Sequence, residues 1–284
     1  MKRYALLCLL LLSGHVYAGT KPLVFVSILP QKFFVEQVSQ GLVEVEVMVG
    51  PGQNPTTYEP TPRKISALAR ADIYFTIGVP FENAWLNRIR RNYPQMKVVQ
   101  CCDDIIDMSA LHADSWHAEH QADDPHVWTS PNNVIAIARR IGQELSKLDS
   151  NNTDRYQQAT TSFIQRLSEL DQQIGKLTRD LSKRKLIVSH PAWSFYAAEY
   201  GFEQISIEQN GKDIQASSLR NLIRQAQQDN IKAVFTQPQF NDKAARIIAT
   251  ELGGKVYSLD PLAYDYIENM LITTRLIVDG LADE

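Results

Sequence analysis

The sequence predicts an α/β protein with parallel sheets, built as two similar halves on either side of one long helix. Short apolar runs alternate with runs of helical period, and this alternation is typical of parallel-sheet architecture. It occurs once before and once after a long helical stretch at residues 153–182. A chain of 284 residues is long enough for two α/β lobes or for one large domain.

The first half is expected to contain four strands connected by helices. The strands are expected at 23–29 (LVFVSIL), 43–49 (VEVEVMV), 72–77 (DIYFTI) and 96–100 (MKVVQ). The helices are expected at 31–39, 63–70 and 81–92. The run at 43–49 alternates apolar and polar residues, as a strand does.

The second half repeats this plan. Its strands are expected at 185–189 (KLIVS), 202–208 (FEQISIE), 232–236 (KAVFT) and 255–259 (KVYSL). Its helices are expected at 193–200, 217–229, 242–252 and 265–281. In the second of these helices, apolar residues keep the i, i+3, i+4, i+7 spacing of an amphipathic helix.

The helical stretch between the halves carries apolar residues at steps of three or four throughout. About 30 residues at 1.5 Å each give a helix of about 45 Å, longer than a lobe is wide. A stripe of this kind suits a rigid connector that packs on both lobes, and it also suits a dimeric coiled coil. We expect the connector and a monomer, with lobes at 19–152 and 183–284.

The N-terminus has the three parts of a secretory signal peptide. Lys2 and Arg3 precede an apolar run, and a small-x-small cleavage pattern ends at Ala18, before Gly19. We therefore expect a periplasmic protein whose signal peptide is residues 1–18. Removal of this segment changes the net charge from −3 to −5, which argues against nucleic acid as a partner.

Residues 108–124 (MSALHADSWHAEHQADD) show no periodicity and hold half of the six histidines in the chain: His112, His117 and His120. A long irregular segment inside a compact lobe is usually functional or disordered. Histidines interleaved with acids can chelate metal without a fixed structure, and a solvated polar loop is the alternative. The adjacent Cys101 and Cys102 suit two thiols, a strained disulfide or a soft metal-binding pair.

Further metal-binding residue types stand at strand ends. His190 follows the strand at 185–189, and Asp260 follows the strand at 255–259. His126 lies in DPHVW at the start of the next predicted helix. Ligands of open α/β sheets bind outside the carboxyl ends of the strands, and two imidazoles with a carboxylate suit Zn²⁺ better than Mn²⁺ or Fe.

Five motifs along the mature chain resemble those of the zinc/manganese-binding solute-binding proteins of bacterial ABC importers (ZnuA-like). They are PGQNPTTYEPTPRKISALARADIYFTIG, DPHVWTSPNN, SHPAWSFYAAEYGF, IEQNGKD and SLDPLAYDYIENM. The resemblance implies two lobes joined by a backbone helix, with the metal in the cleft between them. It also implies delivery of the metal to a membrane permease, without catalysis.

The resemblance implies the metal ligands His126, His190 and Asp260, and the histidine at 190 favours zinc over manganese. A fourth ligand of the family is a histidine in N-P-H-x-Y-E-P, where this chain has Thr56. A neutral hydroxyl is a poor zinc ligand. Water, Glu59 or a histidine of the 108–124 segment would complete the coordination sphere, unless the cargo is another metal or a chelated metal.

Two other functions stay open from the sequence. Three ligands and an open position suit a zinc hydrolase with Glu59 or Glu208 as the base, although the chain has no HExxH motif. The threonine at position 56 also suits an adhesin or chaperone-coupled variant that does not need metal.

Overall fold

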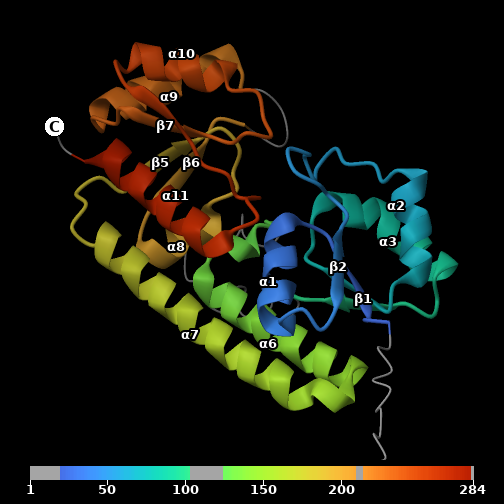
Figure 1. The fold of residues 1–284 in the computed structure, drawn as a ribbon. Helices are drawn as coiled ribbons and strands as arrows, with labels where there is room; N and C mark the ends of the chain where they lie inside the picture. Colours follow the sequence, from blue (N-terminus) through green and yellow to red (C-terminus); the bar gives the residue numbers. More distant parts are fainter. Residues whose placement is uncertain (1–19, 103–123, 209–213, 283–284) are drawn as a thin grey trace, which may run out of the picture.

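The computed structural model describes residues 20–102, 124–208 and 214–282 of the chain. Two four-stranded parallel sheets form two lobes, and a pair of long helices connects them (Figure 1). The predicted α/β fold class is confirmed. The predicted signal peptide and the three histidines of the 108–124 segment lie outside the described residues.

The first sheet has the strand order β2-β1-β3-β4. Its strands are β1 (Leu23–Val26), β2 (Glu44–Val47), β3 (Ile73–Thr76) and β4 (Lys97–Gln100). Its helices are α1 (Leu29–Ser39), α2 (Pro62–Ala67), which continues as the 3₁₀ helix η1 (Leu68–Arg70), and α3 (Pro80–Asn92). All residues of the central strands β1 and β3 are buried, as their apolar sequences predict.

The second sheet has the equivalent order β6-β5-β7-β8. Its strands are β5 (Lys185–Val188), β6 (Glu203–Ser206), β7 (Ala233–Thr236) and β8 (Lys255–Ser258). Its helices are α8 (Ser194–Tyr200), α9 (Ala216–Gln228), α10 (Lys243–Glu251) and α11 (Tyr266–Leu281). All eight predicted strands are present, and each is shorter than expected, with four residues.

The connection between the sheets consists of the 3₁₀ helix η2 (Val127–Thr129), helix α6 (Pro131–Leu148), the 3₁₀ helix η3 (Ser150–Asn152) and helix α7 (Thr153–Thr178). The side chain of Ser130 caps α6 by accepting a hydrogen bond from Asn133 N, and Pro131 occupies the first helical position. Helix α7 ends four residues before the predicted limit at 182.

The apolar stripe of α7 is buried inside the chain. Its buried side chains are Tyr156, Thr160, Phe163, Leu167, Leu170, Ile174 and Thr178. The helix packs on α6 and α1 of the first half and on α11 and α8 of the second. The connector interpretation is therefore confirmed, and the coiled-coil interpretation is wrong, because the stripe that a partner helix would need is already covered.

One buried apolar cluster runs through both halves, from β1 at one end to α11 at the other, and a smaller cluster lies beneath α9 and α10. The two sheets thus share a continuous core. Within the described residues, no helix is both long and apolar enough to span a bilayer.

Candidate metal centre

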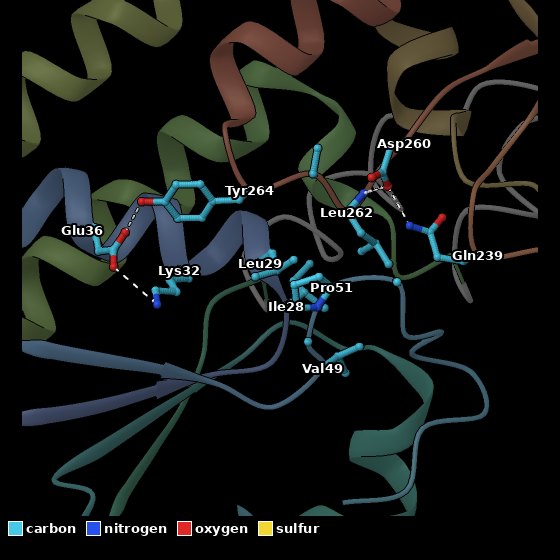
Figure 2. Close-up of a pocket in the computed structure, with 13 residues that line it drawn as sticks. Ile28, Leu29, Lys32, Glu36, Val49, Pro51, Gln239, Asp260, Leu262 and Tyr264 are labelled. Atoms are coloured by element: carbon cyan, nitrogen blue, oxygen red, sulfur yellow. Dashed lines mark hydrogen bonds and ion pairs between the residues drawn. The ribbon is translucent and has the colours of Figure 1, made fainter.

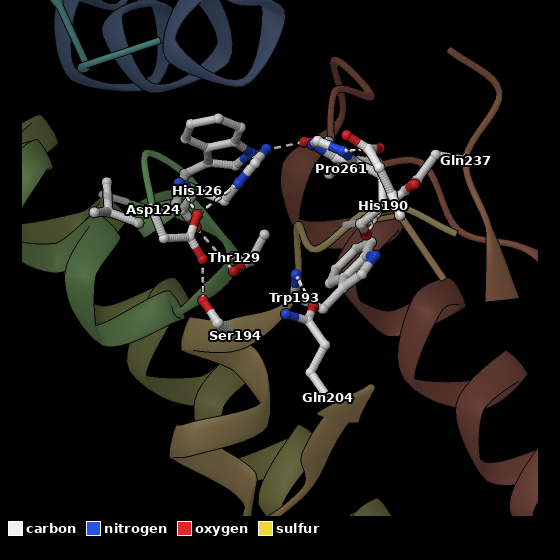
Figure 3. A network of polar contacts seen from close by, with 12 residues as sticks. Asp124, His126, Thr129, His190, Trp193, Ser194, Gln204, Gln237 and Pro261 are labelled. Atoms are coloured by element: carbon white, nitrogen blue, oxygen red, sulfur yellow. Dashed lines mark hydrogen bonds and ion pairs between the residues drawn. The ribbon is translucent and has the colours of Figure 1, made fainter. Parts of the chain in front are cut away.

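Two imidazoles from distant parts of the sequence meet between the halves of the molecule. His126 directly precedes η2, and His190 lies two residues after the end of β5. Their ring centroids are 5.3 Å apart, with 77° between the ring planes (Figure 3). The structure therefore brings together two of the three ligands that the sequence predicts.

Each imidazole contacts a carboxylate through Nδ1. Nδ1 of His126 lies 2.6 Å from Oδ1 of Asp124, and Nδ1 of His190 lies 2.7 Å from Oε2 of Glu208. A carboxylate at Nδ1 selects the tautomer with its proton there and leaves the lone pair on Nε2. Among the described residues, neither Nε2 atom has a hydrogen-bond partner. Metal-ligating histidines are held in this way, with the carboxylate fixing the ring and increasing its basicity.

Asp124 is the more buried of the two carboxylates, with 8% of its side chain exposed against 21% for Glu208. Burial alone would raise the pKa of Asp124. The charge of His126 and hydrogen bonds from His126 and Ser194 outweigh burial and hold the pKa of Asp124 below its ordinary value. Asp124 therefore remains a carboxylate at neutral pH and keeps a proton on His126 Nδ1.

Aromatic side chains fix the planes of both imidazoles. Phe240 stacks on His190, with ring centroids 4.2 Å apart and 17° between the planes. Trp128 lies against His126 at 5.3 Å between centroids. The histidine side chains keep exposed fractions of 15% at position 126 and 14% at position 190, so they are shielded from solvent but not sealed.

The segment that carries His126 is tied to the second half of the molecule. Nε1 of Trp128 donates a buried hydrogen bond of 2.7 Å to the carbonyl oxygen of Pro261 (Figure 3). The hydroxyl of Ser194 donates to Asp124. Because Pro261 directly follows Asp260, the Trp128 bond holds the His126 segment beside the segment of the third predicted ligand.

Asp260 stands after β8 with its carboxylate oriented by two donors. Oδ1 accepts a hydrogen bond of 2.7 Å from Gln239 Nε2 and one of 2.9 Å from the backbone N–H of Leu262. Oδ2 has no hydrogen-bond partner among the described residues.

Asp260 also lines a cavity of about 530 Å³ between the lobes (Figure 2). The first half contributes the residues that follow β1 and β2, and the second half contributes those that follow β7 and β8. The side chains of Tyr264 and Glu36 form a hydrogen bond across it. The carboxyl ends of strands from both sheets therefore face one interlobe cavity, which is where the family resemblance implies the metal.

The described residues do not include a group of three His, Cys, Asp or Glu side chains arranged to hold one ion. Asp260 is thus not gathered with the two histidines in a closed three-ligand set. Thr56 and Glu59 are exposed, and the N–H of Thr56 is bonded to Asn54 Oδ1 in a turn. Within the described part of the chain, neither forms a hydrogen bond or ion pair with the two histidines or with Asp260. Tyr58 of the same loop packs on Phe81.

Cys101 and Cys102 are buried thiols at the end of β4. The thiol of Cys102 donates to the carbonyl oxygen of Ile77 at 3.4 Å. The strained disulfide is therefore not formed, and burial within the first lobe argues against a metal-binding role for this pair.

Three residues support the site without having been predicted as supporting groups: Asp124, Glu208 and Gln239. Each had a signal in the sequence. Asp124 stands two residues before His126, while Glu208 and Gln239 follow strands β6 and β7, whose carboxyl ends flank those of β5 and β8. Residues at the ends of neighbouring parallel strands meet at one sheet edge. Polar residues that follow the adjacent strands are therefore expected to lie beside the predicted ligands.

Comparisons with known proteins show the family and the fold of the chain. A family described as "Zinc-uptake complex component A periplasmic" matches residues 24–280. A structure titled "Crystal structure of ZnuA" is 35% identical, with a TM-score of 0.84, and the match covers 92% of this chain and 100% of that one. The high-affinity zinc uptake system protein ZnuA of Bacillus subtilis (strain 168) is 26% identical over 254 residues, or 86% of this chain and 79% of that protein.

Proposed function

The chain belongs to the ZnuA family of periplasmic zinc-uptake components, and we propose from this premise that it is the metal-capturing component of an ABC importer. In this role it binds a divalent transition metal, with Zn²⁺ as the preferred ion, and delivers it to a membrane permease. The proposal includes export through the signal peptide at residues 1–18, action as a monomer, and lobes at 19–152 and 183–284.

One observation carries this function. His126 and His190 approach from different lobes, each with Nδ1 on a carboxylate and Nε2 without a partner among the described residues. Two oriented imidazole nitrogens between lobes suit a borderline-soft cation such as Zn²⁺.

We propose His126, His190 and Asp260 as the protein ligands. The Trp128–Pro261 hydrogen bond supports this set, because it fixes the His126 and Asp260 segments side by side. The unpartnered Oδ2 of Asp260 is available to a cation. An ion entering the cleft would then draw the carboxylate and the imidazoles onto one centre, which couples cargo binding to the interlobe geometry.

The fourth coordination position is the part of the site that Thr56 leaves open. X-ray absorption of the zinc-loaded chain would count imidazoles. Two imidazoles support water or Glu59 as the remaining ligand, and three support a histidine among His112, His117 and His120. The combined change His117→Ala and His120→Ala separates these outcomes, because it weakens zinc binding only if the segment supplies a ligand.

Calorimetric titration of the metal-free mature chain tests the function itself. We expect one Zn²⁺ per chain and a rise in thermal stability with zinc, because a ligand that binds only the native state stabilises it. An absence of binding by zinc, manganese and iron alike would contradict the proposal.

The hydrolase alternative receives no support from the site. Glu208, one of its two candidate bases, is engaged with His190 Nδ1 at 2.7 Å. Glu59, the other, is exposed and forms no hydrogen bond or ion pair with either histidine in the described residues. We therefore propose transport without catalysis. Manganese, iron or a chelated metal remain competitors to be included in the titrations.

A further inference from the structure

A loop that the sequence analysis did not single out lies between the two proposed ligands of the second lobe. In the sheet order β6-β5-β7-β8, strand β7 is flanked by β5, which leads to His190, and by β8, which leads to Asp260. Residues 237–240 (QPQF) directly follow β7. Parallel strands end at the same edge, so this 237–240 loop stands between the imidazole and the carboxylate.

The loop holds His190 by its first and last residues. Nε2 of Gln237 donates to the carbonyl oxygen of His190 at 2.9 Å, and Oε1 of Gln237 accepts from Ser189 Oγ at 3.1 Å. Phe240 stacks on the imidazole ring with 4.2 Å between centroids. Backbone and ring of His190 are therefore both fixed by the same short segment.

The third residue of the loop, Gln239, holds the carboxylate of Asp260 (Figure 2). Its Nε2 donates to Oδ1 at 2.7 Å, and Leu262 N donates to the same oxygen at 2.9 Å. Both bonds go to Oδ1, so Oδ2 is the one oxygen left without a partner among the described residues. The carbonyl oxygen of Asp260 also accepts from Asn269 Nδ2 at 2.7 Å, which fixes the backbone at this point.

The oxygen of the Gln239 amide shows that the contact with Asp260 depends on the amide nitrogen as donor. Oε1 is buried and has no hydrogen-bond partner in the part of the chain that the structure describes. The opposite amide orientation would place two acceptors against each other at Asp260. The amide is therefore held at Asp260 by its donor, although its acceptor stays unsatisfied, and buried atoms of this kind are rare enough to need an explanation.

We propose that Gln239 determines metal specificity by restricting Asp260 to one coordinating oxygen, an inference that rests on the proposed transport function. A carboxylate that presents only Oδ2 adds one ligand, which suits the four-coordinate geometry of Zn²⁺. A carboxylate with both oxygens available can bind the ion in bidentate fashion and raise its coordination number. Hard cations such as Mn²⁺, which prefer six mainly oxygen ligands, are suited to this arrangement. Gln239 is thus a positioning residue that acts on the ion through Asp260.

The test compares the mature chain with its Gln239→Met variant, which keeps an unbranched side chain of similar size and removes the donor. Competition titrations measure zinc and manganese binding of both proteins. We expect zinc affinity to fall by about 10- to 100-fold, the range for lost supporting hydrogen bonds, while manganese affinity changes by less than about threefold. X-ray absorption of the zinc-loaded variant should show one additional oxygen ligand.

Two further variants serve as controls. Gln239→Asn keeps the amide donor on a shorter stem and should retain a larger share of the zinc preference than Gln239→Met. Gln228→Leu, at an exposed position at the end of α9, should leave both affinities unchanged. Thermal unfolding of the metal-free proteins should give the same midpoint for the wild type and Gln239→Met.

The outcomes distinguish the proposed role of Gln239 from the proposed transport function. An unchanged zinc-to-manganese ratio in Gln239→Met, with normal zinc binding by the wild type, overturns the role of Gln239 and leaves the transport function in place. An equal loss for both metals, with a lower midpoint for the metal-free protein, also overturns it, because it indicates a structural role. A wild type that binds neither metal overturns both.

Discussion

The two sheets of this molecule have matching backbones and different chemistry at their carboxyl ends. In the first sheet, Val49 N donates to Ser27 O at 3.0 Å, and in the second, Glu208 N donates to Ser189 O at 3.0 Å. These bonds connect the first strand of each sheet to the edge strand beside it. The register therefore makes Glu208 the counterpart of Val49, a carboxylate in place of a buried valine.

Two more positions differ in the same direction. Ile28 directly follows Ser27, and His190 directly follows the matching Ser189. Cys102 and Asp260 each stand two residues after the last strand of their sheet. Ile28 and Cys102 are fully buried, whereas His190 and Asp260 are partly exposed at the cleft. The sheet thus supplies the positions, and the side chains on them decide between packing and binding. The first half then supplies its imidazole, His126, from beyond its sheet.

The largest expected effect comes from truncating one counterpart pair. His190→Ala should weaken zinc binding by more than the roughly 100-fold typical of supporting groups, because it removes a ligand itself. Ile28→Ala, at the matching position, should instead lower the free energy of unfolding by about 2–5 kcal/mol through a core cavity. Zinc titration of both variants measures the affinity, and urea unfolding of both measures the free energy of unfolding. A strong loss of zinc affinity in Ile28→Ala, at full stability, would break the comparison.

The first lobe has its own buried acid, Glu82 of α3, which accepts hydrogen bonds from Ser27 and from the backbone N–H groups of Ile77 and Gly78. Burial raises the pKa of Glu82 to about 7, against the lowering effect of these bonds. Above pH 4.5, the ordinary pKa of this carboxyl, the unfolded chain has released the proton of Glu82. The folded chain keeps this proton until the pH reaches about 7. This contribution to stability is present below pH 4.5 and is lost as the pH rises to about 7.

We therefore expect wild-type stability to fall by up to about 3 kcal/mol between pH 5 and pH 8 through Glu82, and Glu82→Gln to remove this part of the pH dependence. Urea unfolding of both proteins at the two pH values measures it. The same pH dependence in both proteins would show that the buried acid does not titrate in this range. Zinc affinity at fixed pH should not change, since Glu82 lies in α3 and its hydrogen-bond partners are Ser27, Ile77 and Gly78 rather than the proposed ligands.

The role of Glu208 is tested by removing only its charge. Glu208→Gln should weaken zinc binding by about 10- to 100-fold, because an amide orients His190 less well and lowers its basicity. Glu203→Gln, at the other end of the same strand, is the matched control and should bind zinc as the wild type does. Equal binding by all three proteins would mean that the Glu208 contact has no part in the site.

The smallest effects concern the helices that carry both sheets. A Cβ on Gly142 of α6 would lie 2.3 Å from Thr160 Oγ1 of α7, whereas a Cβ on Gly175 of α7 would meet nothing within 4 Å. Gly142→Ala should destabilise the chain by about 1–2 kcal/mol through overpacking. Gly175→Ala should stabilise it by about 0.5–1 kcal/mol through helix propensity. Thermal unfolding distinguishes them, and a stabilising Gly142→Ala would contradict the close approach of the two helices.

The sequence by itself determined the α/β class, all eight strands and the long helix, because each of these depends on local periodicity. It also marked His190, which follows a strand, and His126 in the DPHVW motif, since imidazoles stand out in a chain with six histidines. The stripe of α7 was visible as well, but its partner was not. Only the packing of α6, α1 and α11 onto that stripe decided between a connector and a coiled coil.

The tertiary structure alone decided how the site residues are supported. The Nδ1 contacts of Asp124 and Glu208, the ring of Phe240 on His190 and the amide of Gln239 on Asp260 join residues that the sequence does not pair. Such contacts depend on which strands are neighbours in a sheet and on how two lobes meet. Local propensity carries no information on either, because both follow from burial of the shared core, to which residues along the whole chain contribute.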